Sequence, residues 1–322
     1  MRRIYYMFMR GGTSYSIAKT LTDEGIPTPT GKEKWRGTTI ESILTNEKYR
    51  GSARLQKKFT VDFLTKKQKV NEGEVPQYYI EESHEAIIDP VEWDAVQDEI
   101  ARRKEIGRAY SGKSVLSGKI VCGDCGARYG SKVWHSRDKY RSVVWQCNSR
   151  FDKSKKKCST PHISEAEVKR RFLYAYNRLI TNKDAIIADC AEAKDILTDT
   201  SKIEKEMVEL KSEIDVVAEL TRKCINENSS SAQNQEEFTE KYNGYVEKYE
   251  KLKIRSDALA AEMDRKKTTG RNIERFLSAL SAGDDLMTEF DDGLWFATVD
   301  RVTVKSDGTL IFRFFNGTEV EG

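Results

Sequence analysis

The sequence lacks any apolar run long enough to cross a bilayer, and 33% of its 322 residues are charged. Its N-terminal apolar run, within residues 1–10, is too short for a signal peptide, so nothing supports an oxidising compartment. Paired carboxylates, a catalytic triad and a phosphate-binding loop are also missing, which argues against an enzyme complete in itself. These absences predict a soluble cytoplasmic protein without membrane contact.

The net charge is only +3, but it is unevenly distributed along the chain. Residues 1–190 carry 36 Lys+Arg against 24 Asp+Glu, which is +12, whereas residues 191–322 carry 19 against 28, which is −9. The basic front part predicts a polyanionic partner, with nucleic acid the first choice, and the acidic remainder predicts a different task.

Two short helices are predicted near the N-terminus, after an apolar start that suggests a cut from a longer protein. Ser14 caps the first helix, which ends at Gly25, and Thr38 caps the second, with Glu41 completing a capping box. This is the pattern of a helix-turn-helix, which many helical domains that bind no DNA share. Basic residues flanking the second helix favour a phosphate backbone as partner, with a solvated charged surface as the alternative. They are Lys32, Lys34, Arg36, Lys48 and Arg50.

A basic hairpin, a helix and a linker are predicted next. Residues 49–70 are strand-like and rich in lysine, and Trp93, Val96 and Ile100 recur at helical spacing as core. Gly, Ser and basic residues over positions 101–119 mark a positively charged linker, which either tracks a DNA groove or serves solubility.

Four of the six cysteines, Cys122, Cys125, Cys147 and Cys158, form a Cys-x-x-Cys knuckle followed by two separate cysteines. This arrangement predicts one structural zinc ion held by four thiolates. A disulfide pair and a redox Cys-x-x-Cys are the competing interpretations, and His135 or His162 could replace one thiolate. Cys190 and Cys224 are interpreted as small buried apolar residues.

Apolar residues settle into heptads on both sides of the polar segment 226–231. One series runs from Ile203 to Cys224 and the other from Phe238 to Met263, which predicts an antiparallel helical hairpin with arms of about 40 Å. Such an arm either contacts another arm or protein, or packs on the body. Beyond Gly270 we expect a separate helix, a short helix over residues 285–290, and strands that complete a sheet with the cysteine segment.

These segments predict an α+β multidomain fold: a helical domain with a small β element, a zinc-ribbon α+β domain, and an antiparallel coiled-coil hairpin inserted in it. The predicted boundaries are residues 1–105 for the helical domain, 106–119 for the basic linker, 120–195 with 268–322 for the zinc-ribbon domain, and 196–267 for the hairpin.

The whole chain resembles the C-terminal DNA-binding half of the large serine recombinases, the phage integrases and related transposases. The matching segments are residues 11–44, 48–51 and 87–93, a linker with Leu116-Ser117-Gly118, the ribbon with Cys122-Gly-Asp-Cys125-Gly, the arm, and residues 299–317. The resemblance implies sequence-specific binding of double-stranded DNA at attachment half-sites, with protomers pairing through the arm. A directionality factor is a candidate further partner, and the setting is the cytoplasm of a bacterial host, associated with DNA.

The family's catalytic serine domain, which precedes these segments, has no counterpart here, so we assign no nucleophile and expect catalysis only from a parent serine recombinase. The alternatives are a zinc-stapled coiled-coil scaffold that binds protein, and the equivalent part of a serine transposase. The candidate DNA contacts are Arg36, Thr38, Thr39, Ser42, Arg50, Arg102, Arg103, Arg108, Tyr110, Lys113, Lys132, Arg137, Lys139, Arg141, Lys155 and Lys156.

Overall fold

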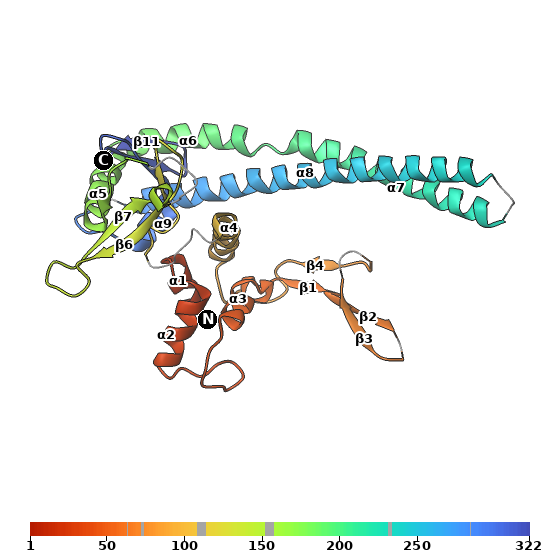
Figure 1. Cartoon of the computed structure of the whole chain (residues 1–322), viewed down its shortest axis with the longest axis horizontal. Helices are drawn as coiled ribbons and strands as arrows, with labels where there is room; N and C mark the ends of the chain where they lie inside the picture. Colours follow the sequence, from red (N-terminus) through yellow and green to blue (C-terminus); the bar gives the residue numbers. More distant parts are fainter. Residues whose placement is uncertain (63, 72–73, 108–113, 152–157, 231–233, 284) are drawn as a thin grey trace. The chain divides into compact units, whose positions relative to one another are not determined.

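The computed structural model describes residues 1–62, 64–71, 74–107, 114–151, 158–230, 234–283 and 285–322 (Figure 1). The chain divides into two compact units, Met1–Lys183 with Arg275–Gly322, and Asp184–Glu274. In the sequence, the second unit lies between the two segments of the first. Within the described residues, no helix is both long and apolar enough to traverse a lipid bilayer.

The first unit begins with a helical module, α1–α4. Its helices are α1 (Arg2–Met9), α2 (Ser14–Asp23), α3 (Gly37–Leu44) and α4 (Pro90–Ile106). They share one hydrophobic core, to which Tyr5, Ile40 and Val96 contribute from three different helices. The Tyr5 hydroxyl donates a hydrogen bond to the Ile43 carbonyl at 3.0 Å, which compensates for its burial.

Both predicted helix starts in this module differ from the structure. Thr13, not Ser14, caps α2, because its side chain accepts from the Ser16 amide in a capping box. Arg36, not Thr38, occupies the N-cap of α3, without a side-chain cap. The physical reason is the buried Trp35, whose amide donates to Thr22 Oγ1 at 3.0 Å and whose indole donates to the Ile26 carbonyl at 2.7 Å. This anchor sets where α3 begins, whereas the local sequence favours a later start.

A two-part β-ribbon separates α3 from α4. After the 3₁₀ helix η1 (Glu47–Arg50), the strands are β1 (Ala53–Leu55), β2 (Lys58–Asp62), β3 (Lys67–Val70) and β4 (Tyr78–Ile80). β1 pairs only with β4 and β2 only with β3, both antiparallel. The predicted basic hairpin is therefore present, extended at its base by a second strand pair.

The cysteine segment and the C-terminal strands share a sheet, and we call this part of the first unit the ribbon domain. Its strands are β5 (Ile120–Cys122), β6 (Tyr129–Trp134), β7 (Ser142–Cys147), β8 (Ile163–Ser164), β9 (Val299–Val304), β10 (Leu310–Phe314) and β11 (Glu319–Glu321). The sheet order is β11-β10-β9-β5 in one sheet and β6-β7-β8 in the other, and β5 runs parallel to β9. Helix α5 (Glu165–Thr181) contributes Phe172 to the core, and helix α9 (Asp292–Thr298) contributes Trp295. The centroids of the two rings are 5.1 Å apart.

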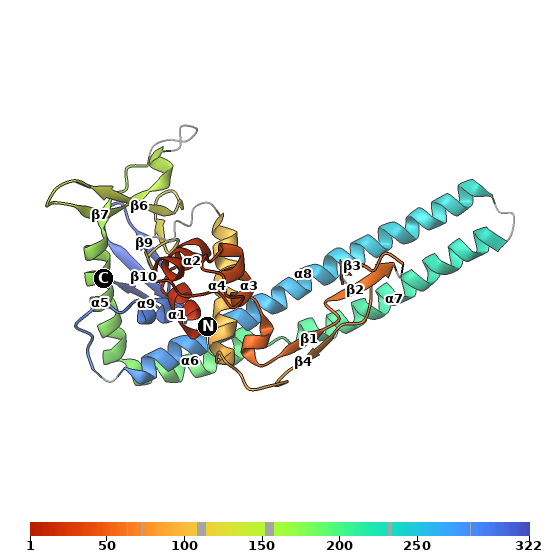
Figure 2. The ribbon, with the colours of Figure 1, turned by 90° about the horizontal axis from the view of Figure 1, so that it is seen from below.

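The second unit contains the predicted helical hairpin, built by α6 (Lys183–Thr198), α7 (Ser201–Ser230) and α8 (Gln235–Ala282), the last of which continues into the first unit. Ile203, Leu210, Val217 and Cys224 are buried at seven-residue intervals on α7, and Leu259 of α8 packs in the same seam. At 1.5 Å per residue, the 30 residues of α7 extend about 45 Å. Figures 1 and 2 both show α7 and α8 side by side. The mixed α+β fold class is confirmed.

Three predicted helix limits are wrong in this part of the chain. α7 continues through the polar residues 226–230, and α8 does not stop near Gly270. Residues 285–290 form no helix, because Met287 exchanges backbone hydrogen bonds with the side-chain amide of Asn177, at 2.8 and 3.0 Å.

Candidate metal centre and nucleic-acid interface

The structure brings together the four cysteines that the sequence singles out. Their Sγ atoms all lie within 4.8 Å of one another, with Cys122 and Cys158 at 3.5 Å and Cys125 and Cys147 at 3.4 Å. Four thiolates about 2.3 Å from a zinc ion stand about 3.8 Å apart, so the cluster fits a tetrahedral zinc site.

Local backbone geometry positions the knuckle. The Gly126 amide donates to the Cys122 carbonyl at 3.0 Å, and Gly126 has φ +69°, which favours glycine. The Gly123 amide donates to the Val304 carbonyl at 2.8 Å, and a Cβ at Gly123 would lie 3.1 Å from that oxygen. The knuckle is thus fixed to the end of β9.

Two hydroxyl groups lie beside the sulfurs. Thr160 Oγ1 is 3.0 Å from both Cys122 Sγ and Cys158 Sγ, and it donates to Asp124 Oδ2 at 2.7 Å. Ser149 Oγ is 3.2 Å from Cys125 Sγ and 3.1 Å from Cys147 Sγ. Burial opposes ionisation of Cys125, but hydrogen bonds led by that of Ser149 lower its pKa to about 6. The Ser149 hydroxyl can donate its hydrogen to one of the two neighbouring thiolates, whereas the Thr160 hydrogen is directed to Asp124.

Neither candidate histidine belongs to the four-cysteine cluster. His135 is exposed and lies 3.4 Å from the Asp138 carboxylate, and the His162 ring packs on Trp134 with centroids 4.5 Å apart. The cluster therefore offers a four-thiolate set, without an open position for chemistry on a substrate.

The DNA-contact candidates on α3 share an exposed surface. Arg36, Thr38 and Ser42 are exposed, while Thr39 is half-buried. Thr38 and Ser42 are four residues apart and so stand on the same side of the helix. A helix with a polar exposed face and a basic N-cap is suited to enter a major groove.

A second group of candidates lies on the β6–β7 hairpin. Lys132 lies on β6, with its ammonium 4.6 Å from the centre of the Phe151 ring, and Arg137, Lys139 and Arg141 occupy the connection to β7. All four side chains are exposed. The hairpin therefore presents four cations to solvent at one end of the ribbon domain.

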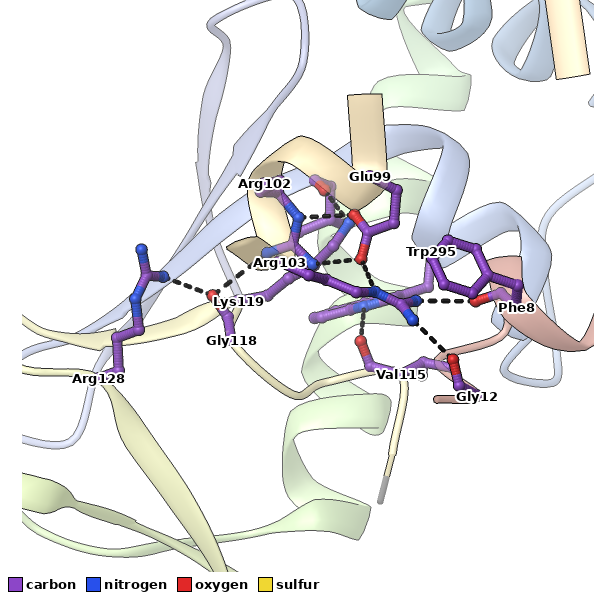
Figure 3. Close-up of polar contacts among 11 residues, drawn as sticks. Phe8, Gly12, Glu99, Arg102, Arg103, Val115, Gly118, Lys119, Arg128 and Trp295 are labelled. Atoms are coloured by element: carbon purple, nitrogen blue, oxygen red, sulfur yellow. Dashed lines mark hydrogen bonds and ion pairs between the residues drawn. The ribbon is translucent and has the colours of Figure 1, made fainter. Parts of the chain in front are cut away.

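Three other candidates are engaged inside the protein. Arg50 pairs with Asp94 at 3.3 Å and approaches Glu81 at 3.9 Å. Arg102 and Arg103 both bind the carboxylate of Glu99 (Figure 3). The remaining candidates, Arg108, Tyr110, Lys113, Lys155 and Lys156, lie outside the described residues.

Glu99 is the centre of a buried charge cluster that sequence reasoning missed. Its side chain is 6% exposed and accepts from Arg102 at 2.6 and 2.8 Å and from Arg103 at 2.5 Å. Burial by itself would raise the pKa of Glu99, but the arginines, with Arg102 foremost, hold it below its usual value. The Arg103 guanidinium also donates hydrogen bonds to the backbone carbonyls of Gly12 at 2.6 Å and Phe8 at 2.8 Å.

The same cluster joins α4 to residues 114–119, for which the sequence predicts a basic linker. Residues 115–119 are buried. Arg102 and Arg128 both donate to the Gly118 carbonyl, at 3.4 and 2.6 Å (Figure 3). The fully buried Lys119 donates to the Val299 carbonyl, and burial lowers its pKa well below the usual value. Trp295 donates to the Val115 carbonyl at 3.1 Å. These contacts tie the helical module to the ribbon domain.

Comparison with known proteins identifies two domains. The Recombinase family model matches residues 1–103, and the Recombinase zinc beta ribbon domain model matches residues 115–177. The chain is 24% identical over 201 residues to the uncharacterized protein YefB of Bacillus subtilis (strain 168). The aligned region covers 60% of this chain and 63% of that protein.

A solved structure described as a crystal structure of an LSR-DNA complex aligns with 97% of this chain and 83% of that chain, at 16% identity and a TM-score of 0.36. The two family models together cover just over half of the sequence, in the order expected from the resemblance. The chain therefore contains a recombinase domain followed by a recombinase zinc β-ribbon domain.

Proposed function

We propose that the chain binds double-stranded DNA at attachment half-sites, as the C-terminal part of a serine site-specific recombinase. The observation that supports this most directly is the presence of two exposed candidate DNA surfaces, α3 and the β6–β7 hairpin, within one compact unit. In this proposal α3 reads a major groove through Arg36, Thr38, Thr39 and Ser42, and the hairpin contacts an outer segment through Lys132, Arg137, Lys139 and Arg141. We leave out Arg50, Arg102 and Arg103, because their guanidinium groups have internal partners.

The proposed zinc ion has a structural role. The four cysteines would hold it, and its charge would keep the thiolates deprotonated and the knuckle closed. This arrangement fixes the base of the β6–β7 hairpin, because Cys147 ends β7 and Cys122 ends β5.

Sequence-specific binding can be tested without a known site. A duplex selected from a random pool and its scrambled counterpart are compared by fluorescence anisotropy across a salt series. We expect tighter binding to the selected duplex and a steep loss of affinity with salt for both. Equal and weak binding to both duplexes would contradict the proposal and favour a protein-binding scaffold.

Combined substitution of Arg36, Thr38 and Ser42 by alanine is expected to reduce discrimination between these duplexes. Because a good base contact contributes about 1–3 kcal/mol, the ratio of the two dissociation constants should fall by roughly 10- to 100-fold or more. Lys248→Ala, at an exposed position on α8, is the control and should leave the ratio unchanged. An unaltered ratio in the triple variant would remove α3 from the reading surface.

We also propose that the helical hairpin pairs protomers bound to DNA. Deletion of residues 200–264 tests this idea, because Lys266 Nζ donates to the Asp199 carbonyl at 2.9 Å and the new ends therefore already lie close together. We expect affinity for a single site to change less than about twofold, while paired complexes on two-site DNA disappear from native gels. A collapse of single-site affinity would instead make the hairpin part of the DNA-binding body.

A further inference from the structure

The β-ribbon between η1 and α4 has no role in the function proposed so far. We call the segment made of β1–β4 and their connections, residues 53–80, the basic ribbon. Its strands pair only with one another, and Leu55, Val61, Val70 and Tyr78 are each between 46% and 58% exposed. A two-stranded ribbon that packs no hydrophobic face against a core is only marginally stable. Burial of apolar side chains therefore does not explain why the chain contains this ribbon.

Charge is the distinguishing property of the basic ribbon. Residues 53–70 carry six cationic side chains and one carboxylate, Asp62. That carboxylate is used locally, since it accepts from the Leu64 amide at 2.9 Å and the Thr65 hydroxyl at 2.6 Å. The six cations are Arg54, Lys57, Lys58, Lys66, Lys67 and Lys69.

Two of these six cations have an acidic partner among the described residues. Lys57 pairs with Glu47 at 2.6 Å and Lys69 pairs with Glu74. Lys58, Lys66 and Lys67 are exposed and form no ion pair with the described part of the chain. Exposed ion pairs contribute about 0–1 kcal/mol each, so even the two paired lysines could exchange their carboxylates for stronger anionic partners.

The lysines stand on both faces of the ribbon. Lys69 lies opposite Phe59 and Lys58 lies opposite Val70, and these neighbouring cross-strand pairs point to opposite sides. Lys67 shares the face of Lys69. A ribbon with cations on both faces is suited to a groove whose two walls are anionic, rather than to a single flat surface.

The ribbon is also held firmly where its two strand pairs meet. Asn71 is 5% exposed and donates from its side-chain amide to the carbonyls of Gln56 at 3.0 Å and Val75 at 2.6 Å. The backbone carbonyl of Asn71 accepts a hydrogen bond from the side-chain amide of Gln77 at 2.8 Å. β2 and β3 are thereby extended beyond β1 and β4, away from α3, as both ribbon views show (Figures 1 and 2).

We propose that the basic ribbon lies along the major groove beside the DNA segment approached by α3 and binds phosphates of both strands without reading bases. The proposal rests on the proposed DNA-binding function. A major groove about 12 Å wide admits a two-stranded ribbon, and lysine acts on phosphates as a point charge. The basic ribbon starts directly after η1, and its strands reach roughly 30 Å, close to one helical turn of DNA.

The test replaces Lys58, Lys66 and Lys67 together by glutamine in the full chain. We expect affinity for the selected and the scrambled duplex to fall by the same factor, about 10- to 100-fold near 0.15 M salt. The slope of log affinity against log salt should become shallower by about 2–3. A matched triple variant of the helical hairpin, Lys241, Lys248 and Lys253 to glutamine, changes the net charge equally and should leave the slope unaltered.

Three results would overturn this inference. An unchanged slope would show that these lysines do not meet DNA and instead keep the ribbon edges from associating with other chains. A loss confined to the selected duplex would indicate base reading. An equal slope change in the matched hairpin variant would mean that net charge alone governs the effect. Failure of the underlying function is distinguishable, because the unmodified chain would then bind both duplexes equally and weakly.

Discussion

Replacing Cys122 by serine is expected to release the metal and unfold the β5–β8 region while leaving α1–α4 folded. The reason is that a structural zinc ion contributes its binding free energy, about 10–16 kcal/mol in small zinc-binding peptides, directly to folding. Serine lacks the soft thiolate donor, and the remaining three sulfurs would be left close together without a cation to offset their charge. The stoichiometry of bound zinc should fall from about one per chain to near zero.

Elemental analysis of the purified protein measures the zinc content, and hydrogen exchange locates the unfolding. Protection should disappear over β6 and β7 and persist over α4. Cys224→Ser is the matched control, because that thiol is buried on α7 and lies outside the four-cysteine cluster. Unchanged zinc content in Cys122→Ser would refute the ligand assignment.

Replacing Glu99 by alanine is expected to lower the free energy of unfolding by about 3–5 kcal/mol, because it leaves buried cations without their counter-charge. Arg103 is the most affected, since its side chain is only 10% exposed and cannot turn to water without losing its bonds to α1. Glu105→Ala, an exposed acidic position on the same helix, should change stability by no more than about 0.5 kcal/mol.

The Glu99 contribution should depend on pH in a defined direction. Its pKa in the folded protein is lowered, so the stabilisation is complete above the pKa of about 4.3 in the unfolded chain and is lost as pH falls through the folded value. Calorimetric melting from pH 7 to pH 3 should therefore show a large difference between wild type and Glu99→Ala at neutral pH that narrows in acid. Equal melting temperatures at pH 7 would show that the cluster is not stabilising.

Periodic and closely spaced patterns could be predicted from the sequence. The seven-residue spacing from Ile203 to Cys224 and the Cys-x-x-Cys knuckle depend on geometry within one helix or one turn, which the sequence states directly. The β9–β10 hairpin followed from its turn residues in the same way. A sheet shared by the C-terminal strands and the cysteine segment could also be predicted, because a lone hairpin requires partner strands.

Contacts between distant segments caused the errors. Gly270 suggested a helix end, but a Cβ there would lie 2.8 Å from Thr198 Cγ2, so the glycine permits close approach within a continuous helix. Residues 114–119 had the composition of a linker, yet Leu116 is fully buried. A composition shared by linkers and by tightly packed turns cannot separate the two.

The charge cluster left a sequence signal that was overlooked. Arg102 and Arg103 follow Glu99 by three and four residues, which is the spacing of paired charges on one helix face. This spacing predicts an internal partner for both arginines beside their possible contact with DNA. Arg103 follows Glu99 at helical spacing and is partly buried, whereas Arg137 is exposed in the connection between two strands.

The parallel pairing of β5 with β9 also has a consequence for the order of events during synthesis. Ile120 faces Val302 in that sheet, so the ribosome must translate both long helices before β5 meets its partner. At 5–20 residues per second this interval lasts roughly 10–40 s. All four cysteines of the cluster are translated early in this interval, the last of them at position 158. The nascent knuckle can thus capture its metal well before the surrounding sheet is complete, and the last strands close around a site already formed.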